Sequence, residues 1–169
     1  GMVLIQLDRA DGNLLDALVK QHDLTVLDVV HDEGWLVRLP ENGPSGMDEL
    51  RAEDGVRWVG ELQPGWRVSP ELLYQPARAP ALAVVPTPDL GVGGYAALAT
   101  DMVRFGAEEA SCDAWMCLAA VDPSQARTLV QHLAHDGRIL WTEAASQLRV
   151  HNALALSIAG VQAVANNAS

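Results

Sequence analysis

Apolar and polar positions follow the same order twice along the chain. In the first half, short runs of aliphatic and β-branched residues predict four strands. Apolar positions with helical spacing predict a helix from Asn13, between the first two runs. A shorter helix is expected after Pro44, where Ser45 and Asp48 resemble a capping box. The four predicted strands of this half are residues 3–7, 24–30, 35–39 and 56–60.

The second half shows the same alternation of strand and helix patterns. Helical spacing predicts a helix over residues 94–105. A second helix is expected to start at Asp122, an acidic cap that is followed by Pro123, and to end at Gly137. The four predicted strands of this half are residues 81–85, 108–112, 115–120 and 138–142.

Two pairs of tryptophans support the repeat. Trp35 and Trp115 lie 80 residues apart, and Trp58 and Trp141 lie 83 residues apart. In each half, the first is expected to begin the third strand and the second to lie inside the fourth. This element order is that of a ferredoxin-like unit, whose antiparallel sheet carries both helices on one face. We therefore predict an α+β protein with two tandem ferredoxin-like β-α-β-β-α-β units and a C-terminal helix.

Prolines mark the expected boundary between the two units. Residues 1–70 are assigned to the first unit, 71–80 to a proline-containing linker and 81–152 to the second unit. Residues 153–169 are assigned to a C-terminal helix and tail, which is apolar on nearly all sides between 153 and 165. Such a helix requires cover. We expect it to pack between the units, and the alternative is that it docks a partner or a following domain.

Composition restricts the class of partner. Apolar residues make up 49% and charged residues 20%, which is typical of a folded globular chain. The net charge of −11 disfavours nucleic acid and anionic membrane surfaces as partners. The most apolar segment, 153–165, is too short to span a bilayer, and no secretory signal is recognisable.

Several strand segments are similar to those of one protease family. Residues 56–60 read Val-Arg-Trp-Val-Gly, and an aromatic and basic pair, Trp66 and Arg67, follows them. Residues 35–38 read Trp-Leu-Val-Arg, and residues 140–143 read Leu-Trp-Thr-Glu. Together these segments resemble the N-terminal pro-region of subtilisin-like serine proteases, over nearly the whole chain.

This resemblance implies a function without catalysis. It implies a propeptide-like module that binds a subtilisin-like protease domain, in cis or in trans, and inhibits it or assists its folding. It also implies secretion. The chain contains none of the three triad motifs of that family, and we predict that it is not an enzyme. On this hypothesis the candidate partner interface consists of Trp66, Arg67, Leu154, Ile158 and Val161.

Other candidate motifs favour structural interpretations. Ser45 has the setting of a helix cap rather than of a nucleophile, because Met47 replaces the glycine of a nucleophile elbow. Residues 91–96 fit a loose dinucleotide pattern, but they do not directly follow a strand, so a loop entering a helix is expected. His132 and His135 fall mostly off the apolar helix face and are expected in solvent rather than on a metal. We therefore predict no metal and no cofactor.

The sequence also bears on the bonding of the two cysteines and on the burial of the tryptophans. Cys112 and Cys117 flank a predicted hairpin tip, where two buried thiols are favoured and a disulfide is possible. Trp66 follows Pro64 and Gly65 and is the best candidate for an exposed anchor. The other four tryptophans are expected in the core.

Two alternative functions remain open. Paired ferredoxin-like units also occur as small-molecule sensors, which is an analogy from the fold. An exposed sheet edge or the apolar C-terminal helix could instead produce a homodimer.

Overall fold

The computed structural model describes residues 1–9, 11–31, 33–41 and 46–145, and they form two compact units. Unit 1 consists of Gly1–Trp66 and Thr87–Asp89. Unit 2 consists of Arg67–Pro86 and the described residues from Leu90 onward. The C-terminal helix predicted over 153–165 lies outside the described residues, and so does the Ser45 cap.

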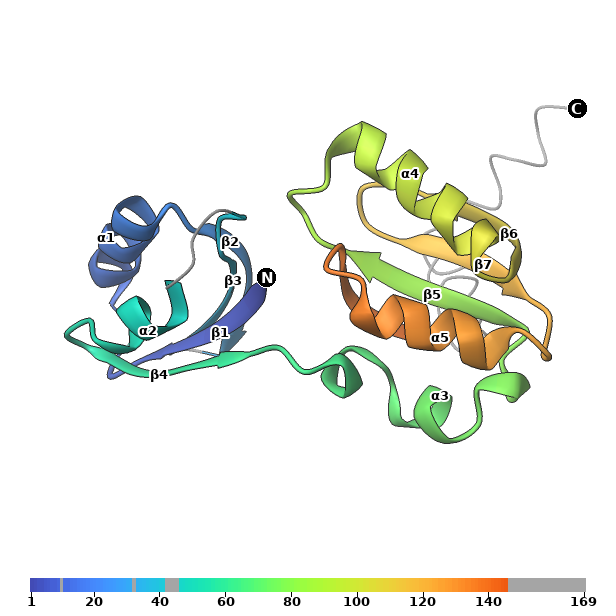
Figure 1. Ribbon diagram of the computed structural model, residues 1–169, viewed down its shortest axis with the longest axis horizontal. Coiled ribbons are helices and arrows are strands. Elements are labelled where there is room, and N and C mark those ends of the chain that lie inside the picture. Colours follow the sequence, from blue (N-terminus) through green and yellow to red (C-terminus); the bar gives the residue numbers. More distant parts are fainter. Residues whose placement is uncertain (10, 32, 42–45, 146–169) are drawn as a thin grey trace, which may run out of the picture. The chain divides into compact units, whose positions relative to one another are not determined.

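Unit 1 is a four-stranded antiparallel sheet with strand order β2-β3-β1-β4 (Figure 1). Its two helices supply Leu18 and Leu50 to a core that also contains Val3, Ile5 and Leu7 of the first strand. The elements are β1 Met2–Leu7, α1 Gly12–His22, β2 Thr25–His31, β3 Gly34–Arg38, α2 Gly46–Arg51 and β4 Val56–Glu61.

Side-chain hydrogen bonds at one end and a left-handed residue at the other determine where helix α1 begins and ends. The Asp11 carboxylate accepts hydrogen bonds from the backbone N–H groups of Asn13 (3.0 Å) and Leu14 (3.3 Å), which would otherwise lack helical partners. Asp23 ends the helix in the left-handed conformation, with φ of 50°. The sequence prediction of a helix here is confirmed, and the cap is Asp11.

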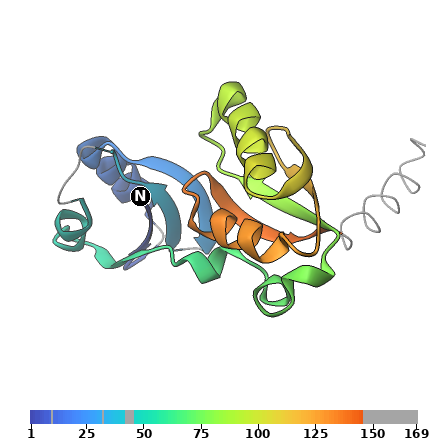
Figure 2. The same ribbon diagram turned by 45° about the vertical axis from the view of Figure 1, so that its right-hand side comes forward.

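Unit 2 has the same topology, with strand order β6-β7-β5-β8. Helices α4 and α5 pack on one face of this sheet, and Figure 2 shows α5 beside β8. A short helix, η1 (Pro64–Arg67), precedes this unit's other elements. They are α3 Pro70–Tyr74, η2 Pro76–Arg78, β5 Ala81–Pro86, α4 Gly91–Arg104, β6 Ala107–Cys112, β7 Cys117–Val121, α5 Ala126–His135 and β8 Ile139–Ala144.

The predicted fold class is confirmed, because both sheets arrange their strands in the chain order 2-3-1-4. The registers also match. Trp58 lies opposite Gln6, and Trp141 lies opposite Val85, so these two tryptophans occupy equivalent positions. Trp35 lies opposite Ile5, but the equivalent position in unit 2, opposite Val84, is held by Cys117. Trp115 precedes β7 and does not begin it.

The proline-containing segment assigned to a linker, 71–80, contains α3 and η2. Leu72 and Ala79 are buried in the core of unit 2. Just before them, Ser69 N–H donates to the Thr142 carbonyl (2.9 Å), and Val68 forms a parallel bridge to Thr142 at the edge of β8. Apolar contacts and main-chain bonds therefore make this segment part of unit 2.

Candidate partner-binding surface

The β6–β7 hairpin of unit 2 is closed by a disulfide between Cys112 and Cys117. The two residues lie opposite each other in the register, with their Cα atoms 4.0 Å apart. Cys117 is fully buried in the core of unit 2, and Cys112 packs against that core. Two separate buried thiols, the favoured sequence interpretation, are therefore wrong, and the disulfide alternative is correct.

The hairpin tip is held by Asp113 and presents Trp115. The Asp113 carboxylate accepts hydrogen bonds from the backbone N–H groups of Trp115 (2.7 Å) and Met116 (2.8 Å), and these bonds lower its pKa. Trp115 is 83% exposed. Core packing was expected here and is wrong, because the tip turns before the strand that would have carried this residue inward.

The sheet of unit 2 has a second surface, on the side opposite α4 and α5, which we call the outer face. Side chains alternate along each strand, so the residues between the core positions point to this side. Glu109, Ser111 and Glu143 supply polar groups there, and the Trp141 indole N–H donates to Glu143 (3.0 Å). The apolar residues of the outer face are Ala81, Ala83, Val85, Leu118, Ala120 and Trp141.

Small residues make a shallow hollow in the outer face. The hollow has a volume of about 200 Å³, and Ala81, Ala120 and Ala145 form part of its lining. Leu118 also lines the hollow, together with Glu109 and Ser111, and is 39% exposed. Alanines leave room for another chain to approach the sheet closely, and Leu118 offers apolar area to bury.

The predicted interface residues have different surroundings. Trp66 is 57% exposed in η1. Arg67 is only 7% exposed, and its Nη1 donates to the carbonyl of Asp136 (3.0 Å) in unit 2, so its guanidinium is part of the interior. Leu154, Ile158 and Val161 lie outside the described residues.

Sequence reasoning missed the outer face. It predicted the hairpin tip between Cys112 and Cys117, but it also began the next strand at Trp115, inside that tip. Leu118 and Trp115 were both assigned to one predicted strand, 115–120. The sequence signal that could have separated them is Asp113, an acidic residue that favours a turn between two cysteines. A turn there would have placed Trp115 at the tip and started the strand at Cys117.

Histidines form local structural contacts in both units. The ring of His132 stacks on Phe105 with centroids 3.9 Å apart, and His135 Nδ1 lies 2.9 Å from the Gln131 carbonyl. In unit 1, Nε2 of His22 lies 2.9 Å from Glu53, a pairing that the sequence did not indicate. Among the described residues, no group of three or more His, Cys, Asp or Glu side chains could hold a metal ion.

The glycine-rich segment forms the start of a helix. Gly91 begins α4 with φ of 65°, and four residues separate it from Pro86, the last residue of β5. The loop between strand and helix is residues 87–90, whereas residues 91–96, which were expected as a loop entering the helix, already belong to α4. None of the described helices is both long and apolar enough to cross a membrane.

Comparisons with known proteins do not assign this chain to a family. No family model matches the chain, and no curated protein matches it. Among solved structures, the NONO-1 homodimer of C. elegans is similar over 86% of this chain, with 13% sequence identity and a TM-score of 0.33. This chain spans 62% of the length of the NONO-1 chain.

Proposed function

We propose that this chain is a non-catalytic, propeptide-like module that binds a subtilisin-like serine protease domain through the outer face of unit 2. The observation that carries the proposal is the combination of a small-residue floor with the exposed Leu118 on that face. The similarity of the strand segments 35–38, 56–60 and 140–143 to protease pro-regions supplies the class of partner.

Binding through this face would gain free energy by burial and not by bond-making chemistry. A partner segment that covers Leu118 and Trp141 removes apolar area from water, at about 25 cal/mol per Å². The carboxylates of Glu109 and Glu143 flank this area and favour a partner surface that carries basic groups or N–H donors. A module of this kind inhibits a protease by occupying its surface, or stabilises the folded protease by binding it.

The hairpin tip supports the same interpretation. Trp115 belongs to a residue type that often dominates binding energy at protein interfaces. The disulfide and the Asp113 hydrogen bonds hold its backbone before any partner arrives. A residue that is already ordered loses less conformational entropy on binding, so this tip is suited to serve as an anchor.

The proposal is tested with the subtilisin-like proteases of the same organism and a chromogenic peptide substrate. We expect the chain to inhibit hydrolysis and to co-elute with one protease in size-exclusion chromatography. Leu118→Asp should weaken inhibition at least about tenfold, because it places a charge at the centre of the buried area. Val103→Asp is the matched control, because Val103 is 46% exposed but lies on α4, on the opposite side of the sheet.

Two results would contradict the proposal. One is the absence of both inhibition and co-elution for every such protease. The other is an equal loss of inhibition in Leu118→Asp and Val103→Asp, since that result would place the contact elsewhere or indicate general destabilisation. Far-UV circular dichroism of both variants separates these two causes.

A further inference from the structure

Two arginine side chains of unit 2 make no contact with a charged, hydrogen-bonding or aromatic partner among the described residues of this acidic protein. Arg78 of η2 and Arg127 of α5 are exposed, and the side chain of neither forms an ion pair or hydrogen bond with another described residue. The remaining described arginines all have such a contact or an aromatic neighbour: Arg9, Arg38, Arg51, Arg57, Arg67, Arg104 and Arg138. The chain has 22 acidic residues for 11 basic ones, so two arginine side chains without a carboxylate partner are unexpected.

The undescribed parts of the chain offer little negative charge. Residues 146–169 contain no Asp or Glu, and the only acidic residue among those not described is Asp32. Nearby, Asp122 accepts a hydrogen bond from Ser124 N–H (2.7 Å) and does not line the groove that holds the two arginines. The two guanidinium groups are therefore not neutralised by carboxylates of their own unit.

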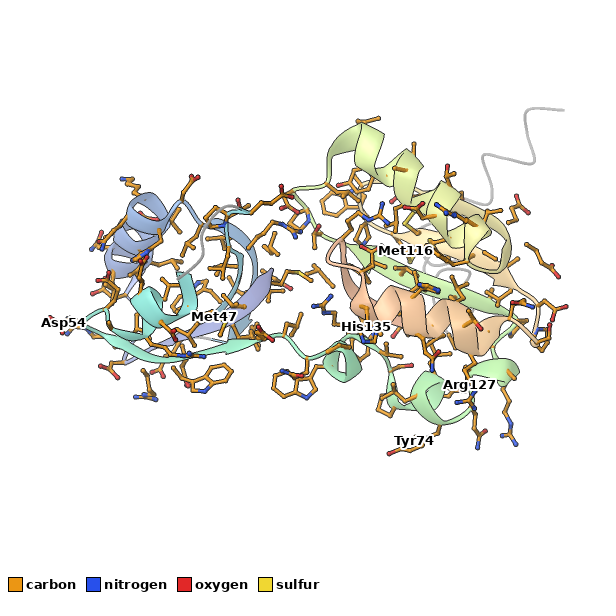
Figure 3. The ribbon with its side chains drawn as sticks, viewed as in Figure 1. Met47, Asp54, Tyr74, Met116, Arg127 and His135 are labelled. Carbon is orange, nitrogen blue, oxygen red and sulfur yellow. A yellow bond between two sulfur atoms is a disulfide. The ribbon has the colours of Figure 1, made fainter. Side chains whose placement is uncertain are left out.

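Both arginines line one groove, which has a volume of about 510 Å³. It lies where η2 packs beside the start of α5. Tyr74 and Pro76 supply an apolar wall, and Ser124 and Thr128 supply hydroxyl groups. Figure 3 shows Tyr74 and Arg127 on the same part of unit 2.

The start of α5 adds positive potential to this groove. Arg127 lies in the first helical turn, which contains no acidic residue, and Gln125 makes no side-chain cap hydrogen bond. A helix N-terminus carries partial positive charge, so a cation in its first turn is unfavourable unless an anion is close. The partial positive charge of this helix N-terminus therefore adds to the charge of the two arginines and favours an anion in the groove.

We propose that this groove, lined by Arg78, Arg127, Tyr74, Ser124 and Thr128, binds a phosphate monoester. Two guanidinium groups carry two positive charges, and a phosphate monoester carries about −1.5 to −2 at pH 7 with three acceptor oxygens. A carboxylate would neutralise only one of the two arginines. Guanidinium groups match phosphate oxygens geometrically, and the Tyr74 ring can contact the organic part of the ester.

This inference goes beyond the proposed function and does not depend on it. The test is a titration of the purified chain with phenyl phosphate, followed by calorimetry and by NMR signals of the arginine Nε–H groups. We expect saturable binding that weakens as NaCl is added, with Arg78 and Arg127 signals shifting first. Benzoate, a monoanion with the same ring, should bind at least about fivefold more weakly.

Variants locate the binding site. Arg78→Gln combined with Arg127→Gln should weaken phenyl phosphate binding at least about tenfold. Arg104→Gln is the matched control, because Arg104 is an exposed arginine of the same unit on α4, and it should bind as the unmodified chain does. Thermal unfolding of each variant confirms that these surface changes leave unit 2 folded.

Three outcomes would overturn the inference: no saturable binding to the unmodified chain, equal binding of benzoate and phenyl phosphate, or equal losses in the double variant and in Arg104→Gln. A further titration with a phosphoserine hexapeptide identifies the source of the ester. If the peptide binds more tightly than phenyl phosphate, the phosphate monoester belongs to a protein partner. If phenyl phosphate binds more tightly, the phosphate monoester belongs to a small molecule.

Discussion

Tryptophans show how the position within a strand, and not residue type, decides burial in this protein. Trp35 points into the core of unit 1 because it lies opposite Ile5, which also points there. Trp58 lies opposite Gln6, on the other side of the same sheet, and is exposed. Its ring covers Gly60, where a Cβ atom would collide with the indole. The glycine is therefore needed for the close approach of this ring.

Arg138 pairs with two carboxylates of unit 2, those of Asp101 and Asp136. Its Nη2 lies 2.6 Å from Oδ2 of Asp136 and 2.7 Å from Oδ2 of Asp101, and its Nε also donates to Asp136. Burial disfavours the charged form of Asp136, but the hydrogen bonds from Arg138 outweigh it, so the pKa of Asp136 lies below its ordinary value. The carboxylate therefore stabilises the folded state when it is ionised.

We predict that Asp136→Asn lowers the free energy of unfolding at pH 7 and has a smaller effect at pH 3. A lowered pKa gives stability that is present above the unfolded-state pKa, near 3.9, and is lost as the pH falls through the folded-state pKa. Urea unfolding of both proteins at the two pH values measures this difference. Glu108→Gln, on the exposed part of β6, is the control and should change little. An equal effect of Asp136→Asn at both pH values would contradict the prediction.

Among the elements, the N-termini of helices α1 and α5 show when a capping residue in the sequence predicts the first residue of a helix and when it does not. Asp11 caps α1 as a short polar residue should, and the helix begins directly after it. Asp122 was expected to do the same for the last helix, but its side chain and carbonyl close a turn over Pro123, Ser124 and Gln125. Helix α5 then begins at Ala126, because Ala126 and Leu129 are held in the core of unit 2.

We predict that Asp11→Ala destabilises unit 1 by about 1 kcal/mol, because two N–H groups of α1 lose their acceptor. The measurement is chemical unfolding followed by circular dichroism. Asp16→Ala, on the exposed side of the same helix, is the control. This substitution removes an equal charge without removing a cap and should cost much less. Equal losses in the two variants would argue that charge, and not capping, determines the effect.

For the molecule as a whole, the repeat explains the architecture and the charge affects its stability. Each unit has its own core, and the corresponding strands have matching registers. The net charge of −11 means that acidic side chains repel one another when the chain is compact. Salt screens this repulsion over roughly 10 Å at 0.1 M ionic strength.

We predict that the midpoint of thermal unfolding rises when NaCl is added from near zero to 150 mM. Repulsion among the excess carboxylates weakens more than the short ion pairs, such as that between Arg138 and Asp136, which are partly buried. Differential scanning calorimetry at fixed pH measures this shift. A midpoint that falls with salt would show that the ion pairs outweigh the repulsion. Sucrose at matched osmolality controls for general solute effects.

The candidate surfaces were less predictable than the fold. Exposure of Trp66 is expected from its position after Pro64 and Gly65, because a chain that leaves a sheet at such residues stays at the surface. Burial of Arg67, one residue later, depends on its hydrogen bond to Asp136, which is 69 residues away in the chain. The groove of Arg78 and Arg127 also joins segments that are far apart in the sequence.

Short-range patterns in the sequence determined the repeated order of strands and helices, because periodicity, caps and turns act over a few residues. The topology of the two units follows from that order, and the structure agrees with it. Only the tertiary structure decided that residues 71–80 join the core of unit 2, that the two cysteines are bonded and that Arg78 and Arg127 share a groove. The packing of residues 71–80 and the groove depend on which distant segments meet in the folded unit, and no local pattern encodes that. The disulfide is local, since its cysteines are five residues apart, but it requires the hairpin register that places Cys112 opposite Cys117.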